Sequence, residues 1–82
     1  LAAEFDPRAT LELLIRRLHG NLASRRGAIE CLRALTGLTH DFHFVAPNRF
    51  RQAAIATWQS WFREHAARLE FHAEDGTVRV RQ

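Results

Sequence analysis

The segment LELLIRRLHGNLASRRGAIECLRALTG, Leu11–Gly37, carries the clearest helical pattern in this chain of 82 residues. Apolar residues recur at the spacing of one helix face, first at Leu11, Leu14, Ile15 and Leu18, then at Ala28, Ile29, Leu32 and Leu35. Gly20 stops the first helix, Asn21 caps the second, and Gly37 ends it. Two helices joined by so short a turn must run antiparallel, so the segment predicts a helical hairpin.

The pattern extends to both sides of this segment. Asp6 precedes Pro7, which is typical of an aspartate cap followed by proline in the first helical turn, so the helix pair is expected over residues 6–37. A third and longest helix is expected over 48–68, capped by Asn48. Its apolar stripe comprises Phe50, Ala54, Ile55, Trp58, Trp61 and Phe62 and continues toward Leu69. Because these aromatic residues follow the core-facing period, we interpret them as core.

The tail LEFHAEDGTVRVRQ, residues 69–82, changes to alternating apolar and polar residues. Asp75-Gly76 indicates a two-residue type I′ turn, so a β-hairpin is expected over 69–81. That turn pairs Ala73 with Val78 and Phe71 with Val80 on an apolar face, and Glu70 with Arg81 and His72 with Arg79 on a polar face. A lone hairpin is marginal in water, so we expect its apolar face to pack on the helices.

Composition is consistent with one mainly α domain over 1–82, made of the helical hairpin, a 38–47 loop, the third helix and the β-hairpin. Hydrophobic residues make up 46% and charged residues 26%, which is ordinary for a globular chain. No apolar run reaches the roughly 18 residues of a membrane span. The single Cys31 excludes an intrachain disulfide. Because the chain begins at Leu1 and lacks methionine, we expect a processed form or a piece of a longer protein, and its compartment stays open.

Residues 11–37 resemble one HEAT repeat, in which a leucine-patterned helix and a polar turn precede Arg-x-x-Ala-x-x-x-Leu, here Arg25, Ala28 and Leu32. Where HEAT repeats usually carry an acidic turn residue, this chain has Asn21. The Trp58-x-x-Trp61 helix resembles the aromatic-rich tail that closes bacterial HEAT-like arrays. The resemblance implies a piece of an α-solenoid, its C-terminal capping end, whose usual work is protein binding.

The loop GLTHDFHFVAPN, residues 37–48, raises the question of a metal site, because His40, Asp41 and His43 are ligand types that zinc accepts. Cys31 or His65 would be a distant fourth ligand. No second clustered pair accompanies them, and an extended segment would place His40 and His43 on opposite faces. His40 and His43 therefore remain weak metal candidates. We interpret the loop as a connection anchored by three apolar residues, namely Phe42, Phe44 and Val45.

No catalytic arrangement is apparent, and neither an enzyme nor a cofactor is expected. The candidate nucleophiles are Ser24, Ser60 and Cys31. Ser60 has no adjacent base, and Cys31 lies beside the apolar stripe, where we expect an inert buried thiol.

All 12 residues counted as lysine or arginine are arginine, and the net charge is +3. Those near the helix junctions are Arg16, Arg17, Arg25, Arg26, Arg33, Arg49 and Arg51. Such a set could follow the phosphates of a nucleic acid. The alternative is local pairing, since Glu12–Arg16, Arg26–Glu30 and Glu64–Arg68 are four apart and Glu30 also reaches Arg33. Arg25 is expected to bridge the first turn of its helix to the preceding helix.

These observations predict a non-enzymatic protein–protein interaction or scaffolding module whose partner is another protein or the rest of its own array. Because the resemblance implies a solenoid that lines its concave surface with the second helix, the expected contact residues are Arg26, Glu30 and Arg33. The alternative is a small arginine-rich nucleic-acid-binding domain.

Overall fold

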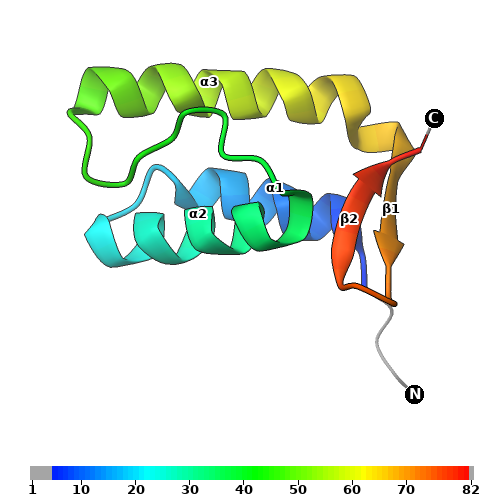
Figure 1. Cartoon of the computed structure of the whole chain (residues 1–82). Coiled ribbons are helices and arrows are strands. Elements are labelled where there is room, and N and C mark those ends of the chain that lie inside the picture. The colour runs from blue at the N-terminus through cyan, green and yellow to red at the C-terminus, as the bar shows by residue number, and fades with distance from the viewer. Residues whose placement is uncertain (1–4, 82) are drawn as a thin grey trace.

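The computed structural model describes residues 5–81 and consists of three helices followed by a two-stranded antiparallel hairpin (Figure 1). The elements are α1 (Pro7–Arg17), α2 (Leu22–Thr36), α3 (Asn48–His65), the short 3₁₀ helix η1 (Ala66–Arg68), β1 (Leu69–His72) and β2 (Thr77–Val80). The predicted fold class, mainly α with a C-terminal β-hairpin, is confirmed. As expected, α3 is the longest element, at 18 residues.

The caps at the start of the first two helices and the end of α2 form as predicted, whereas α1 ends at Arg17 with Leu18 as its C-cap, before the expected stop at Gly20. The Oδ1 atom of Asp6 accepts hydrogen bonds from the amides of Arg8 and Ala9, at 3.0 and 3.2 Å. The Oδ1 atom of Asn21 accepts one from the amide of Ser24 at 2.9 Å. Gly37 ends α2 in the left-handed conformation, with φ 75°. Each bond satisfies a backbone amide that the helix itself leaves without a partner.

The start and the end of α3 differ from the prediction. Asn48 does not cap the helix, because Pro47 takes the cap position and its carbonyl oxygen accepts the amides of Phe50 and Arg51. Asn48 is the first helical residue, and its Oδ1 accepts from the side chains of Arg51 and Gln52. The helix ends at His65 and tightens into η1, so the expected 48–68 helix is three residues too long.

The helices lie side by side, and the loop of residues 38–47 runs back along the molecule between α2 and α3 (Figure 1). The helix α3 packs on α1, while β1 and β2 contact α1 and α2 at the end of the helical layer. The core residues are Leu11, Ile15, Leu18, Ala28, Ile29, Leu32, Phe42, Ala54, Ile55, Trp58 and Val78. One contiguous cluster therefore joins all three helices, the loop and the hairpin.

Two apolar residues outside the hairpin that were expected to be buried are exposed instead, as is Phe71 of β1, at 38%. Phe50 is 54% exposed because it lies in the first turn of α3, ahead of Ala54, the first buried residue of that helix. Val45 is 72% exposed, so it does not anchor the loop. The expected anchoring is carried by Phe42, which is only 2% exposed, and by the half-buried Phe44.

The hairpin register is shifted by two residues from the prediction. The pairs are Leu69 with Val80, Glu70 with Arg79, Phe71 with Val78 and His72 with Thr77, so the loop has four residues instead of two. A type I′ turn needs positive φ at both central residues, and of Asp75 and Gly76 only Gly76 has it. The Asp75 side chain instead accepts bonds from the amide and hydroxyl of Thr77. Because the shift is even, the apolar residues keep one face.

Candidate functional site

The three residues expected to contact a partner lie on one exposed face of α2. Their spacing of four and then three residues places Arg26, Glu30 and Arg33 above one another. The Nε atom of Arg26 lies 3.2 Å from Oε1 of Glu30, which confirms this predicted ion pair. Arg33 forms no ion pair with any residue of 5–81, so the expected Glu30–Arg33 contact is not made. This face therefore offers one neutralised pair and one uncompensated positive charge.

Apolar side chains adjoin these charges, and two shallow grooves run beside α2. The larger groove is about 530 Å³ and is lined by Ile29, Glu30, Arg33, Thr39, Phe42, His43, Phe44 and Val45. The smaller is about 400 Å³ and is lined by Leu22, Ala23, Arg26, Gly27, Glu30 and Phe44. Glu30 and Phe44 border both grooves, so the two form a continuous surface, which we call the α2 surface. The sequence pattern missed the apolar part of this surface, because Leu22 lies off the buried stripe of α2 and Val45 lies in a loop.

A single arginine holds the loop against this surface. Both Nε and Nη2 of Arg25 donate to the carbonyl oxygen of Phe44 at 3.1 Å, and Nη1 donates to that of Gly20 at 3.1 Å. Arg25 therefore reaches the turn between α1 and α2 and not the preceding helix as expected, and its link to Phe44 was not predicted. The Arg26 guanidinium carbon lies 5.8 Å from the Phe44 ring centroid, within the range of a cation–π contact.

The two histidines of the loop have different surroundings. His40 and Asp41 have φ 50° and 62°, so the segment turns here instead of extending. The His40 ring meets Trp58 edge-on, with centroids 4.4 Å apart, and its Nε2 is buried without a hydrogen-bond partner. Burial lowers the pKa of His40, and the nearby Asp41 carboxylate partly opposes this shift. His43 is exposed and lines the larger groove.

In the described part of the chain, other metal-ligand types do not gather around these histidines. Within residues 5–81 no group of three or more His, Cys, Asp or Glu side chains is placed to hold a metal ion. Cys31 is exposed, so the expectation of a buried thiol is wrong. It lies on the flank of the apolar stripe of α2, where none of the elements within residues 5–81 covers it. Ser24 and Ser60 are also exposed, and in the described structure neither hydroxyl is hydrogen-bonded to a histidine or carboxylate.

Four of the seven arginines near the helix junctions are already engaged. Arg16 pairs with Glu12 at 3.2 Å and Arg26 with Glu30, while Arg25 and Arg51 donate to backbone carbonyl oxygens. Within the described part of the chain, the remaining members have no acidic partner, namely Arg17, Arg33 and Arg49. The predicted Glu12–Arg16 pair is confirmed.

The third expected pair is replaced by contacts to a histidine. Nη2 of Arg68 lies 3.3 Å from Nδ1 of His65, and Oε2 of Glu64 lies 3.9 Å from Nε2 of the same ring. His65 therefore stands between the two residues of the predicted Glu64–Arg68 pair.

The observed class is a small, mainly helical domain with an exposed, mixed apolar and charged surface along α2. Comparison of the chain with models of protein families, with curated proteins and with solved structures gave no match. Among the helices of residues 5–81, none is long and apolar enough to cross a membrane.

Proposed function

We propose that this chain is a non-enzymatic protein–protein interaction or scaffolding module of HEAT-like character, at the C-terminal capping end of a larger α-solenoid. Its partner is another protein or the remainder of its own array. The observation that carries this proposal is the α2 surface, where solvent-exposed apolar side chains are surrounded by charged ones.

The composition of the α2 surface supports a protein partner. Leu22 and Val45 are 52% and 72% exposed, and Phe44 is half-buried between the two grooves. Arg26, Glu30 and Arg33 border these side chains. An apolar centre with a polar border is the usual composition of a protein interface. Covering the apolar groups removes them from water, which stabilises the complex by about 25 cal/mol per Å² of apolar area.

An exposed residue of α1 supports the proposed position at the capping end of a solenoid array. The helix α1 packs on α2 and on α3, yet Leu13 is 46% exposed on its outer side. Stacked helical repeats bury such side chains against a neighbour, whereas the terminal repeat needs an atypical element on its other side. We assign that closing role to α3, together with the β-hairpin.

Site-specific photo-crosslinking in cells that make the protein tests the α2 surface. A photo-reactive amino acid at Leu22 should capture a protein, and one at the exposed Thr57 on α3 should not. The double substitution Arg26→Glu and Arg33→Glu should abolish the Leu22 adduct. If every adduct survives this charge reversal, the assignment to the α2 surface is wrong. Equal capture from Leu22 and Thr57 would also contradict it.

A nucleic acid is the second candidate partner, favoured by the three arginines without an acidic partner in the described structure. Against it stands the engagement of the other four arginines, because phosphate binding scales with the number of charges that contact the backbone. Titration with duplex and single-stranded oligonucleotides at increasing salt distinguishes the two functions. Binding that weakens steeply with salt supports the nucleic acid, and its absence removes this candidate.

A further inference from the structure

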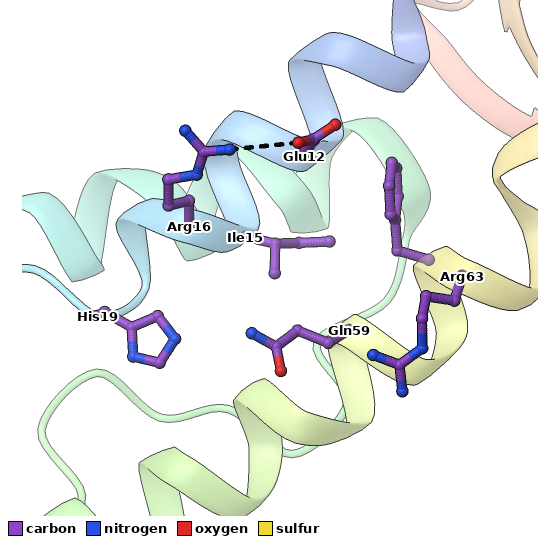
Figure 2. Close-up of a pocket in the computed structure, with 7 residues that line it drawn as sticks. Glu12, Ile15, Arg16, His19, Gln59 and Arg63 are labelled. Atoms are coloured by element: carbon purple, nitrogen blue, oxygen red, sulfur yellow. Dashed lines mark hydrogen bonds and ion pairs between the residues drawn. The ribbon is translucent and has the colours of Figure 1, made fainter.

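A second hollow lies away from the α2 surface, between α1 and α3 (Figure 2). It is about 560 Å³ and is lined by Glu12, Ile15, Arg16, His19, Gln59, Phe62 and Arg63. The α1 residues form one wall and the α3 residues the other, with His19 and Gln59 reaching toward one another across it. We call this hollow the α1–α3 cleft. Its volume lies within the range of about 300 to 1,000 Å³ typical of small-molecule sites.

The α1–α3 cleft is apolar at its base. Ile15 is only 4% exposed and belongs to the core, and Phe62 is half-buried and packs against the same core. Both side chains nevertheless border the cleft. A ligand with an apolar body would therefore gain contact with two side chains that are already held in place.

The polar side chains of the cleft favour an anion. Arg16 and Arg63 carry positive charge, whereas Glu12 is the acidic residue of the lining and is bonded to Arg16 at 3.2 Å. Arg63 has no acidic partner among residues 5–81. Gln59 lies one helical turn before Arg63, so an amide donor and a guanidinium donor share one wall. A guanidinium and an amide are donor types that can hold a carboxylate, which accepts hydrogen bonds at both oxygens.

We propose that the α1–α3 cleft binds a small amphiphilic carboxylate. Arg63 and Gln59 hold the carboxylate, and Ile15 and Phe62 contact the apolar body. His19 closes one end of the cleft. The site is independent of the α2 surface, because the two share no lining residue.

Titration of the 82-residue chain by two-dimensional NMR tests the site, with octanoate as the probe and octanol as the neutral control. Octanoate should produce saturable shifts of the Gln59 side-chain amide, the Ile15 methyl groups and the His19 ring. Octanol should bind at least about fivefold more weakly, since it lacks the charge that Arg63 recognises. Equal affinity for both compounds, or shifts spread evenly over the surface, would overturn the proposal.

Two matched variants separate the site from general charge effects. Arg63→Gln should weaken octanoate about fivefold, whereas Arg81→Gln, which removes the same charge just after β2, should leave its affinity unchanged. Both arginines are exposed, and far-UV circular dichroism should show an unaltered fold for each variant. Equal loss in the two variants would overturn the proposal.

A capped peptide, acetyl-Leu-Glu-Leu-amide, distinguishes a free ligand from a protein segment that presents the same carboxylate. Weaker binding of this peptide than of octanoate supports a small-molecule site. Tighter binding of the peptide would overturn it.

Discussion

The guanidinium group of Arg25 donates two hydrogen bonds, each 3.1 Å long, to the backbone carbonyl oxygen of Phe44. The two residues are 19 positions apart, and a third bond from Arg25 reaches Gly20. One side chain thus joins the turn before α2 to the loop after it. This junction holds Phe44 between the two grooves of the α2 surface, so we expect both stability and partner binding to depend on it.

Arg25→Lys should lower the free energy of unfolding by about 1–2 kcal/mol, because a single ammonium cannot reproduce the planar fork that spans both carbonyl oxygens. Chemical denaturation followed by tryptophan fluorescence measures this loss. The matched control is Arg26→Lys one residue later, which should cost about 0.5 kcal/mol or less, since it alters an exposed ion pair. Equal losses in both variants would show that the Phe44 link does not stabilise the fold.

Two glycines, one within α2 and one at its C-cap, should respond to alanine in opposite directions. Gly37→Ala should destabilise the protein by about 1 kcal/mol, because the C-cap has φ 75° and a Cβ disfavours this conformation. Gly27→Ala should stabilise it by about 0.5–1 kcal/mol, because the position is exposed within the helix and a new Cβ would meet no atom within 4 Å. Thermal unfolding measures both changes, and a shift of the same sign in both variants would contradict the assigned backbone conformations.

The stability of the fold should decrease as the pH falls below about 6.5, the ordinary pKa of histidine. Burial lowers the pKa of His40 in the folded state, so the unfolded chain binds more protons as the pH passes below that value. The stabilisation is therefore complete above the unfolded pKa and is lost toward acid. Denaturation curves at about pH 7.5 and pH 5.5 measure the loss.

The control for this pH dependence is His40→Asn, since asparagine tolerates the left-handed conformation at this position. The variant should lose less stability between the two pH values than the parent chain. The other histidines are present in both proteins, so the difference between the two losses of stability reports the contribution of His40. Equal losses of stability in the two proteins would mean that protonation of His40 is not linked to unfolding.

The β-hairpin should show cross-strand NMR contacts between Phe71 and Val78, with none between Ala73 and Val78. Asp75→Ala should speed amide exchange at Thr77, because it removes the hydrogen bond from that amide to the Asp75 carboxylate. The neighbouring Glu74→Ala should leave this amide unchanged, since Glu74 bonds to His72 instead. Contacts between Ala73 and Val78 would show that the hairpin has the two-residue turn predicted from the sequence.

The Asp75 carboxylate should also make the turn sensitive to acid. Its bonds to Thr77, and secondarily the nearby Arg79, lower its pKa in the folded state. The turn is therefore stabilised above the ordinary aspartate pKa and loses this contribution as the pH falls through the lower folded value. The protection factor of the Thr77 amide, which corrects for the pH dependence of intrinsic exchange, should fall between neutral and strongly acidic pH more in the parent chain than in Asp75→Ala.

Local chemistry explains why the helices could be predicted. A cap such as Asp6 or Asn21 acts on amides two or three residues away, and Gly37 ends α2 through its own backbone conformation. The apolar period of each helix likewise depends only on residues within a few turns. The same local rules were insufficient for Asn48 and Asp75. Pro47 takes the cap position expected for Asn48, and Asp75 accepts bonds from Thr77, the first residue of β2, in place of the expected two-residue turn.

The sequence alone was sufficient for the helical hairpin, the third helix, the apolar face of the β-hairpin and the Arg26–Glu30 pair. Each of these depends on residues that lie close together in the sequence. Tertiary structure decided which surfaces exist. The Arg25–Phe44 link, the left-handed turn at His40 and the α1–α3 cleft each bring together groups that no period relates. Their positions follow from how α3 and the 38–47 loop pack on the first two helices, and such long-range packing is not encoded in any short segment.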